Sequence, residues 1–403
     1  MATSVSTLGQ ALDQIERIKQ QQSTLGLLQN QLASGKKTNV FSGLETDVIV
    51  SKRARADFNA LETYINNVDI ADRRINQMTI TIEELQAQAG NLANVIAGEI
   101  QQGEINLENV NDLASNLIPF LEDLVNIQEG DRYLFSGSAT SNKPLELSNG
   151  TLTTFLQGEL NDWQGNSATA TPSSLTTEDL IASYRGVNDT VIGYNADLSS
   201  GNISPVTVRA DKFIEVDYTT LANDSGFKDI IIAASALEQL TTTDPNSSFH
   251  IDKIKLDFSD YENATNPADL PVTPPPTEDS QVFTLFPVPL DLEDPDVRSQ
   301  IEFENKQRAD NYFDVFNDLG SMINQAIDDL DQLRFALESD RARLSEIRES
   351  HELEQNTLLN TIGGVENVDI NEVALELNYL QVQLEASFRV TATISQLNLA
   401  NFI

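Results

Sequence analysis

The stretch LGQALDQIERIKQQQSTLGLLQNQLASG, residues 8–35, determines how the rest of the chain can fold. Its apolar residues recur at spacings of three and four over residues 8–18 and again over residues 25–32. This spacing predicts an amphipathic helix with a narrow apolar seam. Gly35 follows the last apolar residues, and glycine is the residue that favours a helix C-cap. The helix is therefore expected to end there, before a loop over residues 38–46.

Proline is confined to the middle of the chain, because all 13 prolines lie between Pro119 and Pro295. Proline lacks a backbone donor and clashes inside a helix, so the proline-free flanks favour long helices. Further amphipathic helices are predicted over residues 47–98, 107–128, 297–361 and 370–399. We expect a kink at Pro119, and a break in the helical pattern at Gly363 and Gly364.

The composition of the chain changes between residues 133 and 297, where short Thr- and Val-rich runs alternate with Asn, Asp, Gly and Ser. Strands are predicted over residues 151–156, 189–194, 206–209, 213–218 and 251–258, with one helix over residues 225–240. The proline-rich segments 271–276 and 287–295 read as linkers. The predicted fold class is therefore mostly α with an inserted β-rich domain.

The two terminal helices are predicted to depend on partners. An amphipathic helix of about 25 residues is marginal in water, and most of its stability comes from packing its apolar face. We expect both termini to be loosely ordered in the monomer and to become ordered against other copies of the chain. A helical hairpin within one chain, always folded, explains the spacing equally well. The residues expected at the assembly interface are Leu8, Leu12, Ile15, Leu25, Leu28 and Leu32 of the first helix and Val373, Leu377, Leu380, Leu384 and Ile394 of the last.

The composition bounds the function of the chain. Its 403 residues include 62 acidic and 25 basic side chains, a net charge of −37, which repels nucleic acid and anionic membranes. The chain has no cysteine, so it forms no disulfide or thiolate site. The first twelve residues lack the basic start and long apolar core of a secretory signal peptide. Metalloprotease, hydrolase, Walker and dinucleotide-binding motifs are absent, so we expect no enzyme activity, cofactor or metal site.

Several segments resemble the bacterial flagellin superfamily. Leu25–Asn39, LGLLQNQLASGKKTN, resembles the flagellin motif of a leucine-striped helix followed by L-[AS]-S-G-[KR]-x-N. Leu384–Ile403, LEASFRVTATISQLNLANFI, resembles the amphipathic helix that closes flagellin chains. Gly130–Leu145, GDRYLFSGSATSNKPL, and Val216–Phe227 are similar to segments of the hook–filament junction branch of that family.

The resemblance implies a layered subunit. Residues 1–45 and 365–403 would form a terminal coiled-coil assembly domain, and residues 46–132 and 297–364 a helical rod domain. Residues 133–296 would form the β-rich outer insert.

The resemblance also implies a structural role in joining hook to filament, with filament flagellin carrying a large outer insert as the alternative. The expected partners are other copies of the chain, the neighbouring hook-associated protein and flagellin, the flagellar export apparatus and an export chaperone. The protein would be extracellular, in the flagellum, after type III export without a cleaved signal peptide. A secreted binding module or glycan hydrolase in the insert is a third reading, and the lack of a convincing acid–base pair counts against it.

Overall fold

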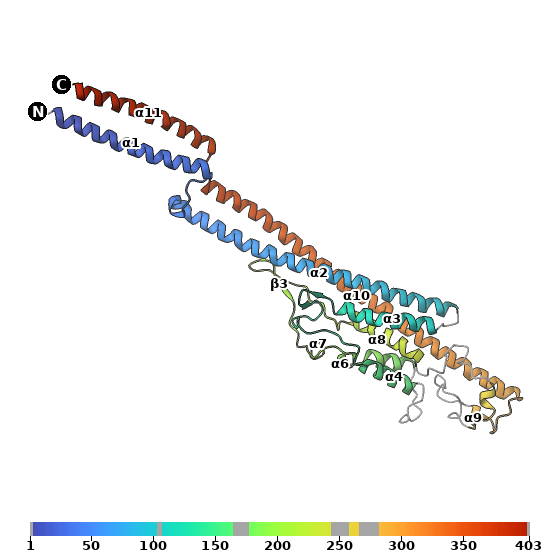
Figure 1. The fold of residues 1–403 in the computed structure, drawn as a ribbon. Helices are drawn as coiled ribbons and strands as arrows, with labels where there is room; N and C mark the ends of the chain where they lie inside the picture. Colours follow the sequence, from blue (N-terminus) through green and yellow to red (C-terminus); the bar gives the residue numbers. More distant parts are fainter. Residues whose placement is uncertain (1–2, 103–106, 164–176, 243–257, 266–281, 401–403) are drawn as a thin grey trace. The chain divides into compact units, whose positions relative to one another are not determined.

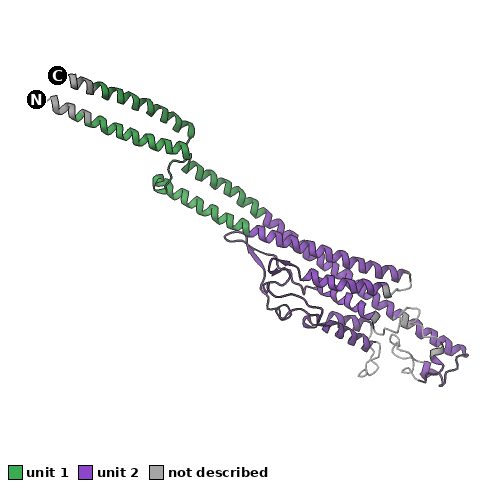
Figure 2. Cartoon of the chain, viewed as in Figure 1, with its two compact units in different colours: residues 1–66, 346–403 green, residues 67–345 purple. Residues whose placement is uncertain are grey.

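The structure is a computed structural model that describes residues 3–102, 107–163, 177–242, 258–265 and 282–400. The chain divides into two compact units, each built from segments that are distant in the sequence (Figure 2). Unit 1 comprises residues 1–66 and 346–403, and unit 2 comprises residues 67–345. Helices dominate both units (Figure 1).

Unit 1 is built from paired helices. Its elements are α1 (Thr3–Ser34), the 3-10 helix η1 (Phe41–Asp47), the start of α2 (Val48–Gln102), the end of α10 (Pro295–Glu366) and α11 (Ile370–Ala400). Helices α1 and α11 pack side by side and run antiparallel, with both chain termini at the same end (Figure 1). Between α2 and α10, the ring of Tyr64 lies 5.9 Å from that of the buried His351. The α1–α11 pair is the geometry that the hairpin alternative requires. Ordering on assembly concerns the protein in solution and stays a prediction.

The helices of the flanks lie close to the predicted ranges, and α1 ends at the predicted cap. The Gly35 amide donates to the Gln31 carbonyl at 2.8 Å, and Gly35 has a φ of 68°, which glycine adopts without strain. The predicted break at Gly363 and Gly364 is wrong, because α10 continues through both residues to Glu366. Helical glycine costs about 1 kcal/mol. The last turns are held by burial of Ile362 and Glu366 on one face of the helix. Helix α3 (Leu107–Val125) continues through Pro119, and the predicted kink stays a prediction.

Unit 2 has an apolar core around helix α8 and a separate apolar cluster around Tyr261 and Val282. Besides parts of α2 and α10, its elements are α3, β1 (Gln128–Glu129), β2 (Arg132–Tyr133), α4 (Thr151–Trp163), α5 (Thr177–Arg185), α6 (Asp189–Ile192), α7 (Ala196–Ser200), β3 (Thr207–Arg209), β4 (Glu215–Asp217), α8 (Ser225–Thr242), η3 (Phe258–Tyr261) and α9 (Val282–Leu285). Helix α8 packs on α3, α4 and α5. It also approaches α10 closely, since a Cβ atom on Gly226 would lie 2.7 Å from Cγ of Leu330. Ile82 and Leu85 of α2 and Ile323 of α10 are fully buried.

The described part of residues 133–296 is not β-rich. The segments 151–156 and 189–194, predicted as strands, lie in α4 and in α6 with the turn after it. In α4, Leu152, Leu156 and Leu160 recur every four residues and are all buried, so helical packing overrides the local Thr-rich composition.

Two predictions for the middle of the chain are confirmed. The runs 206–209 and 213–218 contain the antiparallel hairpin β3–β4, in which Val208 lies opposite Val216. The predicted helix over residues 225–240 is α8. The predicted strand over residues 251–258 lies outside the described residues except for Phe258, which begins η3, and the linker 271–276 lies outside them entirely. The division into two units does not test the three-layer arrangement, which stays a prediction.

Candidate functional site

The residues expected at an assembly interface lie on α1 and α11, and about half of them line the seam between these helices. Leu28 of α1 and Val373 and Leu384 of α11 are buried. Leu25, Leu377 and Leu380 are half-buried. The remaining expected residues on α1, Leu12, Ile15 and Leu32, are exposed, and the side chains of Leu8 and Ile394 lie outside the described residues.

The apolar seam of α1 drifts around the helix, which explains why it divides. With 3.6 residues per turn, Leu28 lies about 160° around the helix axis from Leu12. One neighbouring helix therefore cannot cover both residues. Between the two halves of the seam, the Gln21 side chain donates to the Gln383 side-chain oxygen of α11 at 3.4 Å. The side chains of Leu12 and Ile15 are therefore left exposed in one chain.

Helix α11 carries a second apolar face that the sequence reasoning missed. Leu375, Tyr379 and Val382 are 71%, 67% and 67% exposed, and Val390 further along the helix is also exposed. These four residues, the outer stripe of α11, lie roughly 110–170° from the mean direction of the seam residues around the helix axis. In the sequence, Leu375, Tyr379 and Val382 follow one another at spacings of four and three, each two positions after a seam residue. A helix that is apolar on opposite sides is suited to burial between neighbours on both sides.

The helix pair is joined to the rest of unit 1 at an elbow formed by residues 35–38 and 366–369. The Lys37 amide donates to the Glu366 carbonyl at 2.7 Å, and the Val368 amide donates to the Gly35 carbonyl at 3.0 Å. These bonds tie the segment after α1 to the segment before α11.

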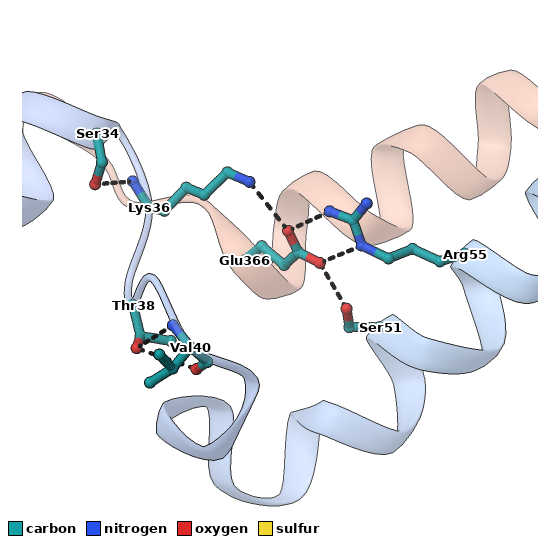
Figure 3. Close-up of polar contacts among 7 residues, drawn as sticks. All are labelled: Ser34, Lys36, Thr38, Val40, Ser51, Arg55 and Glu366. Atoms are coloured by element: carbon teal, nitrogen blue, oxygen red, sulfur yellow. Dashed lines mark hydrogen bonds and ion pairs between the residues drawn. The ribbon is translucent and has the colours of Figure 1, made fainter.

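One buried carboxylate, that of Glu366, lies at the centre of the elbow (Figure 3). Its Oε1 accepts hydrogen bonds from Ser51 Oγ at 2.6 Å and from Arg55 Nε at 2.8 Å. Its Oε2 accepts a bond from Arg55 Nη2 at 2.7 Å and lies 3.7 Å from Lys36 Nζ.

These contacts set the protonation state of the cluster. The hydrogen bonds from Arg55, followed by the bond from Ser51 and the charges of Arg55 and Lys36, lower the pKa of Glu366 to about 2 against the opposing effect of burial. The hydrogen bond to Glu366 is also the main cause that raises the pKa of Arg55. The carboxylate therefore stays ionised throughout the neutral and mildly acidic range.

The two internal segments singled out in the sequence meet inside unit 2. The rings of Phe135 and Phe227 lie 5.1 Å apart, and the Ala222 amide donates to the Phe135 carbonyl at 2.8 Å. Gly137 has a φ of 57°, and a Cβ atom there would collide with the Ile203 side chain. The residues of this segment thus serve packing and a tight turn.

Two further classes of site were sought over the described ranges. No group of three or more His, Asp or Glu side chains there is arranged to hold a metal ion. None of the helices there has the length and apolar character that a membrane crossing needs. Unit 1 presents the outer stripe of α11 as an exposed apolar surface, next to an elbow held by polar contacts.

Comparisons with known proteins point to one family. Residues 321–403, which include Glu366 and all of α11, match the family model of the bacterial flagellin C-terminal helical region. A solved structure described as a candidate flagellar hook-associated protein from Vibrio parahaemolyticus is similar over 76% of this chain and 97% of that chain, at 10% identity and a TM-score of 0.32, too low to carry an argument. The search of curated proteins returned no match. The match over α11 and the adjoining part of α10 supports the flagellin family for this chain.

Proposed function

We propose that this chain is a structural subunit of the bacterial flagellum that assembles with other copies through its terminal helices. The observation that carries the proposal is the match of residues 321–403 to the C-terminal helical region of bacterial flagellins. The outer stripe of α11 supplies the physical reason. Leu375, Tyr379 and Val382 are each more than 60% exposed on successive turns of this helix, and burial of such side chains against a neighbour is favourable.

The mechanism is burial of apolar side chains between neighbouring copies. Full burial of one large apolar side chain contributes about 1.5–3 kcal/mol, so the outer stripe offers several times this amount before ordering costs. Fixing the backbone costs about 1–2 kcal/mol per residue, which over a helix of 31 residues exceeds what the outer stripe alone supplies, so the seam residues and the helical hydrogen bonds must contribute as well. Order in the terminal helices and contact with neighbours are therefore expected to arise together. In this proposal residues 1–45 and 365–403 form the assembly layer, and the rest of the chain forms the rod and outer layers.

Within the flagellum, we place the subunit at the junction between hook and filament. The similarity of residues 130–145 to the junction branch of the family favours this position. Its partners would be other copies, a hook-associated protein and flagellin, after export through the flagellar apparatus with a chaperone. Filament flagellin is the second candidate, favoured by the family model itself. A junction subunit stops at a short ring when given filament seeds, whereas a filament subunit grows into long polymers.

The test is deletion of residues 370–403. We expect unit 2 of the truncated protein to keep its thermal transition, because its core lies within residues 67–345. We also expect it to lose assembly onto purified hooks and filament fragments, observed by electron microscopy. If the truncated chain still polymerises or joins hooks, the terminal helices are not the assembly surface.

A further inference from the structure

We propose that Glu366 is the positioning residue that fixes the α1–α11 pair against the adjoining ends of α2 and α10. The terminal pair would thereby be presented in a single orientation. The inference stands on the geometry of unit 1. Only its assembly readout also rests on the proposed function.

The α1–α2 and α10–α11 connections of unit 1 both lie near this carboxylate. Glu366 is the last residue of α10, and α11 begins four residues later at Ile370. Lys36 follows the end of α1, and Ser51 and Arg55 belong to the first turns of α2. The side chain of the residue before one connection therefore contacts Lys36 in the other connection and two residues of α2 (Figure 3).

The geometry of the cluster restricts how the elbow can move. Arg55 donates to both carboxylate oxygens, and such a two-point contact sets direction as well as distance. Ser51 donates to the same oxygen as Arg55 Nε, from one helical turn earlier on α2. These bonds hold the end of α10 to the start of α2, and the ion pair with Lys36 and the bond from the Lys37 amide to the Glu366 carbonyl connect this site to the segment after α1.

Apolar packing is sparse at this point, and Ile362 and Val373 are the nearest buried apolar residues on the α10–α11 side. Over residues 363–372, Glu366 is the one residue that is buried. Over residues 35–47 on the other connection, Leu44 is the one buried residue. Hydrophobic contacts are not directional, whereas the hydrogen bonds at Glu366 are. The angle at the elbow is therefore assigned to the polar cluster together with the backbone bonds of Lys37 and Val368.

The absence of native cysteine allows a direct test by spin labelling. Cysteines replace two exposed residues near the elbow, Asn30 of α1 and Asp57 of α2, so that fraying at the far ends does not obscure the result. Distances between the labels are then measured by double electron–electron resonance in the full chain. We expect one narrow distribution for the parent protein and a distribution at least about twice as wide for Glu366→Ala. Glu366→Gln and Arg55→Lys, which keep part of the hydrogen bonding, should be intermediate.

Glu385→Gln is the matched control. Glu385 is an exposed carboxylate of α11 that pairs with Arg389 at 2.8 Å, so its loss removes one charge and one ion pair but leaves the elbow intact. The control should keep the narrow distribution. Circular dichroism checks that each variant keeps its helix content, and the milder Glu366→Gln covers the case in which Glu366→Ala does not fold.

The second readout is the protein concentration needed for assembly. We expect it to rise about tenfold for Glu366→Ala, which corresponds to about 1.4 kcal/mol. It should stay unchanged for Asp310→Asn, which removes the exposed ion pair with Lys306 outside the terminal helices. An unchanged narrow label distance in both Glu366 variants would overturn the inference. Failure of the parent protein to assemble, with the label distances behaving as expected, would instead reject the proposed function and leave the role of Glu366 standing.

Discussion

Units 1 and 2 are built from the same kind of amphipathic helix and reach different degrees of burial. In unit 2, large side chains such as Ile82, Leu85 and Phe316 are fully enclosed, because several elements surround each helix. In the described parts of α1 and α11, the large buried side chains are Leu28, Val373 and Leu384. An apolar stripe therefore yields a complete core only where enough neighbours exist. Unit 2 supplies these neighbours within the chain, and the terminal pair of unit 1 does not.

The largest expected difference between the units is in the cost of cavities. Leu85→Ala in unit 2 should lower the free energy of unfolding by about 2–5 kcal/mol, because the fully enclosed site cannot collapse. Leu28→Ala in α1 should cost less than half as much, because the surrounding helix pair is open to water. Denaturant unfolding followed by circular dichroism measures both. Equal costs would show that the terminal pair has a complete core of its own.

The next effect separates folding from assembly. The double substitution of Leu375→Ser and Val382→Ser should change the stability of the monomer by no more than about 0.5 kcal/mol, since both side chains are exposed. It should raise the concentration needed for assembly by at least about tenfold, because two apolar contacts of about 1.5–3 kcal/mol each are lost. Sedimentation of assembled material measures this. Gln381→Ser, an exposed polar substitution on the same helix, is the control. Normal assembly of the double variant would exclude the outer stripe as an interface.

A smaller effect concerns pH at the elbow. The pKa of Glu366 is about 2 in the folded chain against an ordinary value of 4.5, so its stabilisation is complete above pH 4.5 and is lost as the pH falls through about 2. The parent protein should exceed Glu366→Gln in unfolding free energy by about 1–3 kcal/mol near neutral pH, a modest value because Arg55 and Lys36 are partly exposed. Unfolding curves between pH 6 and pH 2 should show this difference shrinking below about pH 4.5. A difference that stays constant down to pH 2 would contradict the ionised cluster.

The smallest effect lies inside unit 2. The hydroxyl groups of Tyr184 and Tyr194 are buried without a hydrogen-bond partner among the described residues, and burial raises the pKa of both. Tyr184→Phe removes an unsatisfied polar group and should raise the free energy of unfolding of unit 2 by less than about 1 kcal/mol. The melting temperature should rise slightly as a result. Calorimetry measures this shift. A clear loss of stability would mean that the hydroxyl has a partner in solution.

The sequence predicted the flanks well because their signals are local. The spacing of Leu25, Leu28 and Leu32 and the glycine at position 35 lie within a few turns of one helix, so helix type and end follow directly. The strand predicted over residues 151–156 was wrong, because a short Thr-rich run is ambiguous until its packing against α8 is known.

The elbow and the outer stripe were missed for different reasons. Glu366 bonds to Ser51 across 315 positions, and no local pattern announces a contact of that kind. The outer stripe was present in the sequence as regular spacing. It was missed because only one apolar face was expected on α11. The assembly role of the predicted interface residues stays a prediction.

The central claim is that the terminal helices become fully ordered only when they assemble with other copies, whereas unit 2 is fully folded in the monomer. Hydrogen exchange measured by mass spectrometry, on the dilute monomer and on the assembled protein, tests it most directly. The account predicts fast exchange along the distal parts of α1 and α11 in the monomer, slow exchange in the unit 2 segments of α2 and α10, and strong protection of α1 and α11 after assembly. Terminal helices as protected in the dilute monomer as the core of unit 2 would contradict it.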